Sequence, residues 1–276
     1  MLTIAAGLGA VLAWGSGPVI AQEGTGAMDE QAKAAELAKQ LQNPIAALIS
    51  VPFQNNVDWG AGAGDDGYQY RLNIQPVIPI TLNETWNLIS RTILPVVYQD
   101  KVIVLPDDDN QAGLSDVVQS LFFSPQAPTA AGWIWGAGPV FLLPVATDDL
   151  LGADKWGAGP TVVVLKQEKG WTYGALSNHI WSFAGDDARA DVNAAYLQPF
   201  LAYTTARQTT YLVNSESTYD WVNSQWTAPV NLMVAQLVKL GKVPVQFQLG
   251  GRYYLDAPTN GPKWGPRFSV TQLFPR

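Results

Sequence analysis

The chain has 276 residues, enough for one large domain, with 14% charged residues, a net charge of −7 and no cysteine. The absence of cysteine excludes disulfide frameworks and thiol chemistry, and the acidic balance argues against a nucleic-acid partner, which would need a basic surface. A mean hydropathy of +0.03 is too low for a bundle of membrane helices.

The chain opens with an apolar run. Residues 2–14 form its core, and residues 19–21 place small or apolar groups before Gln22, as in a secretory signal peptide. No Lys or Arg precedes the run, which leaves open a gene start further upstream. The alternative is a single membrane anchor helix, but glycines interrupt the run and no stop-transfer charges follow. We therefore expect residues 1–21 to be a cleaved signal peptide that directs export to the envelope of a Gram-negative bacterium.

The next segment carries a helical pattern. Residues 28–42 are rich in Ala, Leu, Glu and Lys, and Ala34, Leu37, Ala38 and Leu41 share one stripe. Asn43-Pro44 ends the pattern, since the residue before a proline disfavours helix. Residues 22–44 are therefore predicted to form a periplasmic N-terminal helix segment that plugs or caps the lower mouth of the domain that follows.

Residues 45–276 alternate between segments rich in β-branched and aromatic residues and clusters of turn residues. The predicted strands are 45–59, 68–82, 85–98, 114–124, 132–146, 156–168, 171–184, 192–205, 208–221, 226–239, 243–255 and 264–274. An even number of strands of about ten residues or more is typical of a transmembrane barrel, whereas strands of soluble sandwiches average about 5–6 residues. The predicted fold class is all-β: a transmembrane antiparallel β-barrel of about twelve strands in an up-and-down meander, with a short N-terminal helix.

The connections differ at the two ends of this meander. Those after odd-numbered strands are mostly long and hold aspartate clusters at 65–66, 107–109, 148–149 and 186–187, whereas the others are mostly shorter, contain no Asp, and often carry Lys or Arg. Outer-membrane barrels have long extracellular loops and short periplasmic turns. The pattern therefore predicts the bacterial outer membrane, with acidic loops outside and both termini in the periplasm.

Period-two alternation separates an apolar face from a polar face in several strands, which indicates lipid on one side and a lumen on the other. The predicted lumen or constriction residues are Arg71, Asn73, Gln75, Arg91, Glu216, Asp220, Gln246, Gln248, Arg252 and Arg267. They are interpreted either as a constriction that orients a polar or anionic group of a solute or as a salt-bridge network that fills a narrow barrel, and both can hold together. Segments 132–146 and 156–168 are apolar on nearly every residue, which predicts a lumen that is partly apolar.

Aromatic residues gather near strand ends, where girdles at the two membrane interfaces would place them, while aromatic core residues would lie in mid-strand. The predicted girdle residues are Trp59, Tyr68, Trp86, Trp133, Trp156, Trp171, Trp221, Trp226, Trp264 and Phe274.

Catalytic and metal-binding motifs are weak. His179 is the only histidine. The three consecutive residues Ser177, Asn178 and His179 cannot converge by themselves, because adjacent strand residues point to opposite faces. The run 106–110, "PDDDN", lacks the spacing and the glycine of an EF-hand loop. We predict no enzyme, no metal site and no cofactor.

Prolines recur inside the predicted strands, at Pro76, Pro95, Pro139, Pro160, Pro199 and Pro229. A proline cannot donate a ladder hydrogen bond, so each is expected at a local defect or bulge. Together they predict a band where the wall kinks, at a narrowing or a lateral opening.

Several stretches, among them "LNIQPVIPITLNETWNLISRTILPVVYQ", "GWIWGAGPVFLLPVATDD" and "GGRYYLDAPTNGPKWGPRFSVTQLFP", resemble the MetA-pathway of phenol degradation family, an outer-membrane transporter group whose members are sometimes labelled "neuromedin U". The resemblance covers nearly all of residues 22–276 and implies a barrel fold and an outer-membrane location. It supplies no active-site motif.

The function predicted from these features is a porin-like channel for passive uptake of small, fairly apolar solutes, aromatic compounds among them. The alternative is a structural or adhesive barrel that acts through its acidic loops and has no open pore, and a lipase ranks third. Expected partners are outer-membrane lipid and lipopolysaccharide, a small hydrophobic solute and, during insertion, the barrel-assembly machinery.

Overall fold

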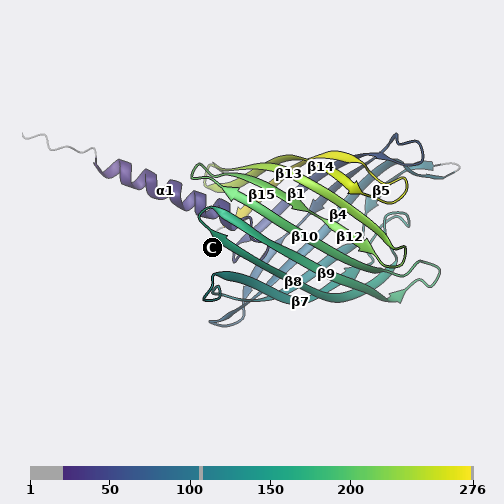
Figure 1. The fold of residues 1–276 in the computed structure, drawn as a ribbon, viewed down its shortest axis with the longest axis horizontal. Coiled ribbons are helices and arrows are strands. Elements are labelled where there is room, and N and C mark those ends of the chain that lie inside the picture. Colours follow the sequence, from purple (N-terminus) through teal and green to yellow (C-terminus); the bar gives the residue numbers. More distant parts are fainter. Residues whose placement is uncertain (1–20, 106–107, 275–276) are drawn as a thin grey trace, which may run out of the picture.

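The strand-rich region of the chain closes on itself. A computed structural model describes residues 21–105 and 108–274, and within these residues a single antiparallel sheet closes by pairing β1 (Ile49–Ala61) with β15 (Trp264–Phe274) (Figure 1). Closure removes the unpaired edges that an open sheet would expose. The predicted fold class, an antiparallel barrel of twelve strands with a short N-terminal helix, is confirmed. The predicted signal peptide lies outside the described residues, apart from Ala21.

Each strand position of the barrel is occupied either by one continuous strand or by two shorter strands that follow each other in line. The uninterrupted crossings are β1, β4 (Trp86–Leu105), β7 (Trp133–Leu143), β8 (Lys155–Glu168), β9 (Trp171–Gly185), β10 (Asn193–Thr204), β13 (Gln225–Leu240), β14 (Val243–Asp256) and β15. The interrupted crossings are β2 (Gly67–Ile74) with β3 (Val77–Thr81), β5 (Asp108–Leu114) with β6 (Val117–Pro125), and β11 (Thr209–Ser215) with β12 (Ser217–Asp220).

The acidic connection predicted at 99–113 is wrong, because most of it is strand. β4 continues to Leu105, β5 begins at Asp108, and the two pair from Val96 with Leu114 to Asp100 with Asn110. The segment 102–104 is Val-Ile-Val, and β-branched residues favour extended backbone over the turn that the aspartates suggest.

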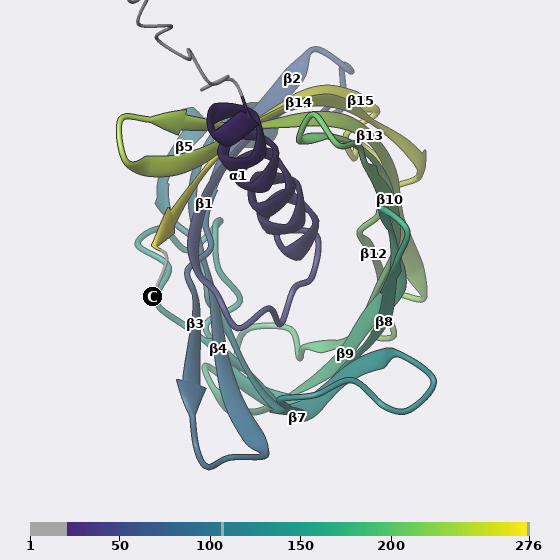
Figure 2. The same ribbon diagram turned by 90° about the vertical axis from the view of Figure 1, so that its left-hand side faces the viewer.

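Helix α1 (Ala21–Gln40) and the C-terminal end of β15 lie at the same end of the barrel, as an even number of strands requires (Figure 1). Figure 2, which looks onto this end, shows α1 across the mouth. Ala38, buried completely, and the neighbouring Leu37 and Leu41 pack against a cluster made by Ala46, Leu48, Leu237 and Leu273. No helix within residues 21–105 and 108–274 is long and apolar enough to cross a bilayer.

Residues 41–48, which we call the N-terminal segment, enter the mouth instead of starting the first strand. The prediction of strand from residue 45 is therefore wrong at its beginning, because the Asn43 side chain and carbonyl accept hydrogen bonds from the N–H groups of Ile45 and Ala46 and hold a turn. Ile45 packs inside the barrel beside Phe122. Gly136 makes this possible, since a Cβ there would lie 3.2 Å from Ile45 Cδ1.

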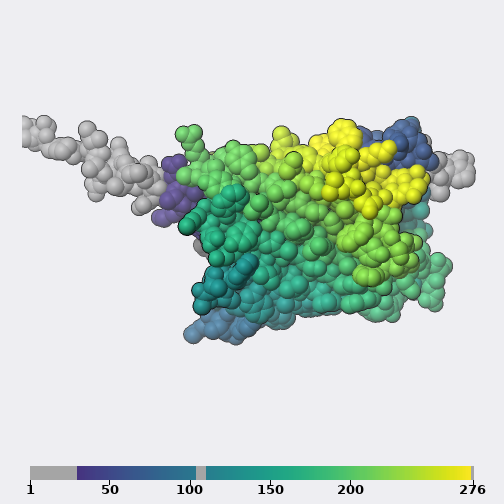
Figure 3. Space-filling view, in the orientation of Figure 1, coloured from purple at the N-terminus to yellow at the C-terminus, as the bar shows by residue number. Residues whose placement is uncertain are grey.

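The barrel is apolar on the outside. Large side chains such as Leu249 (65% exposed) and Leu255 (70% exposed) cover its outer face. A contiguous apolar exterior is typical of a surface that meets lipid and rare on a soluble monomer. In the side view of Figure 3 the face that carries β10, β13 and β14 is a closed wall.

The interior has two kinds of wall. Val163, Leu165 and Leu176 of β8 and β9 are buried, and they form one cluster with Ile45, Ile89 and Phe122 at one side of the lumen. Strands β14, β15, β1, β2 and β4 bring arginines, glutamines and asparagines to the other side. Segments 132–146 and 156–168 are therefore apolar on both faces because one face meets the exterior and the other meets this apolar side of the lumen.

All six prolines named above lie at interruptions of a ladder. Pro76 separates β2 from β3, and pairing of β4 changes from β6 to β5 around Pro95. The β6–β7 ladder is interrupted beside Pro139, between the pairs Ser120–Val140 and Phe123–Ala137. The β8–β9 ladder is interrupted beside Pro160, between the pairs Ala158–Trp181 and Thr161–Asn178. Pro199 and Pro229 face the break between β11 and β12 from opposite sides. The prolines therefore mark local defects in the wall, as predicted, while Figure 3 shows no lateral opening on its face of the barrel.

Candidate functional site

A single large cavity of about 840 Å³ occupies the lumen. It extends from loop residues Pro258 and Pro262 at one end to residues 41–44 of the N-terminal segment at the other. Its lining includes Arg71, Asn73, Gln75, Arg91, Glu216, Gln246, Gln248, Arg252 and Arg267, nine of the ten residues predicted to face the lumen. The N-terminal segment forms the floor of this cavity.

The tenth residue, Asp220, lies at the loop end. It lines a smaller adjoining cavity of about 550 Å³ and accepts hydrogen bonds from the N–H groups of Val222 (2.8 Å) and Asn223 (3.1 Å). Its carboxylate therefore holds the turn that follows β12, and within the described residues it forms no ion pair. The structure places Asp220 at the entrance and apart from the arginines.

Glu216 and Arg267 form a bidentate ion pair across the lumen. Arg267 Nη1 donates to Glu216 Oε1 and Arg267 Nη2 donates to Glu216 Oε2, each at 2.7 Å, and the side chains are 2% exposed for Arg267 and 17% exposed for Glu216. Two parallel N–H···O bonds between a guanidinium and a carboxylate are the strongest geometry that such a pair adopts. The pair connects β15 to the break between β11 and β12.

Two prolines place the Glu216 carboxylate. Neither Pro199 nor Pro229 has an N–H to donate, so the ladders on both sides of residue 216 stop for lack of donors. The Ser215 hydroxyl donates to the Pro229 carbonyl at 2.8 Å and so satisfies a group that the broken ladder leaves unpaired. Glu216 is released from the regular pleat at this point and reaches Arg267.

Arg252 extends the network to a second carboxylate. Its Nη1 lies 3.2 Å from Asp58 Oδ2, and its Nη2 lies 3.7 Å from Glu216 Oε2. Arg252 belongs to β14 and Asp58 to β1, and Gly265 lies on β15 between these two strands. A Cβ at Gly265 would be 1.9 Å from the Val57 carbonyl oxygen and 2.9 Å from Asp58 Oδ1. Only glycine therefore permits this close approach.

Arg71 and Arg91 are held by amides. Arg71 donates through Nε (3.2 Å) and Nη2 (3.0 Å) to Gln69 Oε1, and Arg91 Nη2 donates to Gln75 Oε1 at 3.1 Å. Gln69 in turn donates to Gln99 at 2.8 Å, and Gln75 to Gln54 at 3.3 Å. Among the residues that the structure describes, no carboxylate lies within 4.0 Å of either guanidinium.

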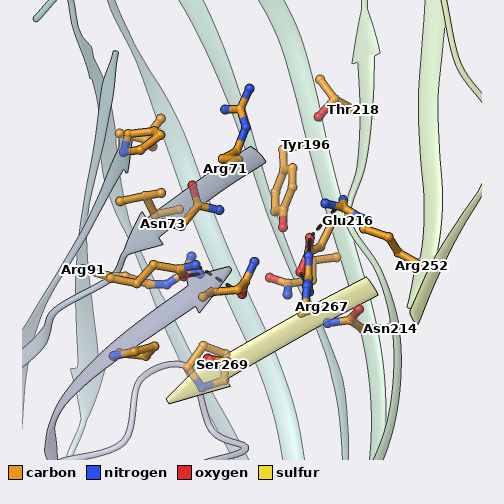
Figure 4. A pocket seen from close by; sticks show the side chains of 18 of the residues that line it. Arg71, Asn73, Arg91, Tyr196, Asn214, Glu216, Thr218, Arg252, Arg267 and Ser269 are labelled. Atoms are coloured by element: carbon orange, nitrogen blue, oxygen red, sulfur yellow. Dashed lines mark hydrogen bonds and ion pairs between the residues drawn. The ribbon is translucent and has the colours of Figure 1, made fainter. Parts of the chain in front are cut away.

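Figure 4 shows how these groups lie around the cavity. Arg71, Asn73 and Arg91 lie on one side of the view, Glu216, Arg252 and Arg267 lie on the other, and Tyr196 of β10 lies between them. The pair Arg71 and Arg91 and the pair Arg252 and Arg267 belong to strands that follow one another around the barrel, in the order β14, β15, β1, β2 and β4. Strand register links the two pairs through β1, since Asn56 is the partner of both Arg71 and Arg267.

Several buried polar atoms in this lumen have no hydrogen-bond partner among the described residues. They include the donors Gln246 Nε2 and Arg252 Nε and the acceptors Asn73 Oδ1, Asn231 Oδ1 and Asp58 Oδ1. Unpaired buried polar groups are rare in native proteins and carry a desolvation cost. Water or the polar group of a ligand would satisfy them.

Four lining or bridging residues were missed at the sequence level: Gln54, Asn56, Asp58 and Tyr196. Period-two alternation in 53–59 places Gln54, Asn56 and Asp58 on one face. The carboxylate of Asp58 and the bridging amide of Asn56 could therefore have been predicted to face the lumen from the same alternation as in the other strands. Tyr196 carried no signal, because most aromatic residues of this chain point outward.

His179 lies outside the lumen, next to tryptophans. Its Nε2 lies 2.7 Å from Asn193 Oδ1, and its ring stacks on Trp181 with the centroids 4.0 Å apart. Ser177, two residues away on the same strand face, donates its hydroxyl to the Tyr196 carbonyl at 2.9 Å. Among the hydrogen bonds of the described residues, none joins the Ser177 hydroxyl to the His179 ring.

Among the side chains that the structure describes, those of residues 30–103 and 110–274, no three His, Cys, Asp or Glu are grouped so as to hold a metal ion. The run 106–110 lies partly outside the described residues.

The ten predicted girdle residues form two groups at opposite ends of the wall. Trp59, Tyr68, Trp156, Trp221, Trp226 and Trp264 lie at or next to strand ends on the loop side, and Trp86, Trp133, Trp171 and Phe274 lie at strand ends on the turn side. Rings of adjacent strands pack together, as Trp59 and Trp264 do with centroids 5.0 Å apart. Interfaces of a bilayer favour aromatic rings at both levels.

Comparison with known proteins supports the fold. No family model matches the chain and no curated protein sequence does, so the family named from the resemblance is not confirmed. The barrel is similar to the crystal structure of the COG4313 outer membrane channel from Pseudomonas putida F1, with a TM-score of 0.64 and 16% sequence identity over 82% of this chain and 94% of that chain.

Two further solved structures are more distant. Outer membrane phospholipase A from Escherichia coli gives a TM-score of 0.47 at 12% identity, covering 81% of this chain and 90% of that one. The β domain of the Bordetella autotransporter BrkA gives 0.45 at 11% identity, covering 83% and 100%. At these identities a likeness establishes the fold alone, and the chain has the fold of an outer-membrane barrel.

Proposed function

We propose that this protein is an outer-membrane channel that lets small, largely apolar solutes diffuse inward. The observation that supports this most is the cavity, which extends from the loops at one end of the barrel to the N-terminal segment at the other. One side of the lumen offers apolar side chains and the other offers charges and amides, so a solute with a small polar group and an apolar body, aromatic or aliphatic, fits both.

The apolar outer face supports an outer-membrane location. Under this proposal residues 1–21 are removed on export, residues 22–44 lie in the periplasm, and residues 45–276 are inserted by the barrel-assembly machinery. The apolar outer face would meet lipid between the two aromatic girdles. The acidic loops would face outward and contact lipopolysaccharide through divalent cations.

Passive uptake is tested with the purified full chain in liposomes and in planar bilayers. We expect single-channel conductance in KCl and entry of small aromatic solutes down their gradient. Empty liposomes, and liposomes with an unrelated closed barrel, provide the background. Absence of both conductance and solute flux would overturn the proposal.

A closed structural or adhesive barrel is the second candidate, and the ion pair that crosses the lumen favours it. Deletion of the acidic loop 186–191 separates the two. Loss of surface binding with unchanged solute entry supports the adhesive function, whereas changed conductance supports the channel.

We propose no hydrolase activity. Support comes from His179, which stacks on Trp181, and from Ser177, whose hydroxyl is already bonded to a backbone carbonyl. A fluorophosphonate probe is expected to leave the protein unlabelled.

A further inference from the structure

We propose that the outer face of the barrel carries a binding site for one glycerophospholipid with an anionic headgroup. An acyl chain of this lipid would lie in a groove across β9, β10, β11, β13 and β14, and its headgroup would lie at the turns that contain Lys169 and Arg207. This inference rests on the proposed outer-membrane location and concerns the lipid around the channel.

The groove is a cavity of about 770 Å³ on the outer face of the wall, separate from the lumen. Its sides are formed by apolar side chains that are exposed or half-exposed, namely Leu201, Val213, Leu232, Val234 and Leu249. The five strands that line the groove are neighbours in the sheet and lie about 4.8 Å apart, so the groove crosses about 19 Å of wall. A single extended acyl chain suits a groove of this shape and chemistry.

The floor of the groove is backbone. Leu212 and Met233 line the groove, but they also line the luminal cavity, and the Met233 sulfur lies 3.9 Å from Arg267 Nη1 inside the lumen. Gly250, the partner of Met233 on β14, has no side chain. Because side chains of a strand alternate between its two faces, the outward neighbours of these residues form the sides of the groove and their backbone forms its floor.

Aromatic rings border the groove at the turn end of the wall. The rings of Trp171 and Tyr203 pack with their centroids 4.9 Å apart, and Tyr211 is the cross-strand partner of Tyr203. All three residues line the groove and lie at or near strand ends. Aromatic rings at this level of a membrane protein meet lipid headgroups, so the headgroup of the bound lipid would lie at the turns beyond them.

Two turns directly beyond these rings carry cations. The first contains Lys169, whose neighbour Gly170 would place a Cβ 3.2 Å from the Tyr203 ring. The second contains Arg207 and joins Tyr203 to its partner Tyr211. Both cationic side chains are exposed, so each can reach a phosphate at the turn end of the groove.

The charges of these two cations are not neutralised locally. Neither Lys169 nor Arg207 forms an ion pair with a described side chain, whereas Lys166 lies 3.0 Å from the carboxylate of Glu168. The turn after β8 therefore carries two lysines and one glutamate and stays positive, and the turn after β10 adds a second excess charge. Anionic lipid headgroups are attracted to such residues at a membrane surface.

A second copy of the chain fits this groove less well than a lipid does. Another barrel would present a convex wall, and the ridges formed by Leu232 and Leu249, each 65% exposed, would keep that wall away from the floor. In the proposed orientation the turns face the periplasm. The groove then opens to the inner leaflet, which in an outer membrane consists of glycerophospholipids.

Lipid retention by the full chain tests the site. Delipidated protein in detergent is mixed with equimolar palmitoyl-oleoyl phosphatidylglycerol and the phosphatidylcholine with the same acyl chains, and native mass spectrometry counts the lipids that stay bound. We expect one retained lipid, with phosphatidylglycerol preferred at least about tenfold, and we expect the preference to fall to about twofold or less in Lys169→Gln/Arg207→Gln.

Two matched variants control for charge and for shape. Lys101→Gln/Lys263→Gln removes two exposed cations at the loop end of the barrel and should leave the preference unchanged. Val234→Trp fills the groove and should reduce retention of both lipids about tenfold, whereas Val164→Trp, the same change at an exposed position of β8 outside the groove, should not. Heat-modifiable migration on gels shows that each variant has a folded barrel.

Equal retention of the two lipids, or an unchanged preference in Lys169→Gln/Arg207→Gln, overturns the site. Equal retention by the two tryptophan variants also overturns it, as does a dimer in place of a lipid-bound monomer. Conductance is measured on the same samples in planar bilayers. Conductance without lipid preference overturns the site and leaves the channel, whereas lipid preference without conductance overturns the channel and supports the site.

Discussion

Arg267 is the residue on which the most polar contacts of the lumen converge. Its guanidinium donates to Glu216 through both Nη atoms and to Asn56 Oδ1 through Nε at 2.7 Å. Asn56 then donates to the Arg71 carbonyl at 3.3 Å, so a continuous polar network joins β2, β1 and β15 to the break between β11 and β12. This network is the salt-bridge network that the sequence predicted, whereas a constriction that orients a solute stays a prediction.

Glu216→Gln should destabilise the barrel and raise its preference for anions, because Arg267 and Arg252 lose a shared counter-charge. Removing one partner of a dry buried pair costs about 3–5 kcal/mol, and less is expected here since the cavity admits water. Urea unfolding from lipid vesicles and the reversal potential in a KCl gradient measure the two effects. The double variant Glu216→Gln/Arg267→Gln is the control, and it should recover some of the lost stability.

At the scale of elements, the defects in the strands are as informative as the strands. Pro199 and Pro229 have no N–H to donate, so the hydrogen-bond ladders are interrupted on both sides of residue 216. Glu216 therefore departs from the regular pleat, and its carboxylate reaches across the lumen to Arg267. The N-terminal helix contacts the apolar cluster at the mouth only through its C-terminal end. The contact is made by Leu37, Ala38 and Leu41.

Ala38→Glu should release α1 from the mouth without unfolding the barrel, because it places a charge among Ala46, Leu48, Leu237 and Leu273. Limited trypsin digestion should cleave faster after Lys39 while the barrel remains intact. Ala32→Glu makes the same substitution at an exposed position of the same helix and should leave cleavage at the wild-type rate. Equal rates in the two variants would contradict the docking described here.

A second contact ties the helix to the barrel through Glu30, whose carboxylate lies 2.8 Å from Lys239 Nζ. The hydrogen bond and charge of Lys239 hold the pKa of Glu30 below its usual value of 4.5. A lowered carboxyl pKa means that the contact contributes at pH values above 4.5 and is lost as the pH falls through the lowered value.

The helix should therefore become more mobile on acidification below pH 4.5. Because the chain has no cysteine, a nitroxide on Lys33→Cys reports this mobility at a single site. Adding Lys239→Gln should remove the pH dependence and give high mobility throughout. A label whose mobility stays constant with pH in both proteins would refute the prediction.

At the scale of the whole molecule, the barrel reverses the usual distribution of side chains. Apolar groups cover the exterior, while much of the polar and charged surface lies inside around a cavity. This arrangement is stable only if the exterior meets a solvent of low polarity, since an exposed apolar surface of this extent favours aggregation in water.

Leu249 and Gln248 are adjacent residues of β14 that point to opposite sides of the wall. Leu249→Arg should lower the stability of the barrel in lipid vesicles by about 2–4 kcal/mol if the residue faces the middle of the bilayer, whereas Gln248→Arg, which faces the lumen, should cost much less. Reversible urea titrations in vesicles compare the two. Equal costs would show that the outer face does not meet lipid.

The fold class, the number of strands and the faces that alternate with period two could be predicted from the sequence. Period-two patterns and long acidic connections depend only on the local order of residues, so they can be recognised in the sequence without information on tertiary contacts. Nine of the ten residues expected in the lumen line its main cavity for that reason. The hairpin between β4 and β5 was misread because β-branched residues and aspartates gave opposing signals.

Which charges pair depends on contacts between strands. Glu216 meets Arg267 because only β13 and β14 separate β12 from β15 in the curved wall, and Asp58 meets Arg252 because Gly265 lets the side chains of β1 and β14 approach. Both partnerships join residues distant in the chain, and neither spacing nor periodicity encodes them. Arg71 and Arg91 have amide partners instead, the side chains of Gln69 and Gln75, because no carboxylate among the described residues lies within 4.0 Å of either guanidinium.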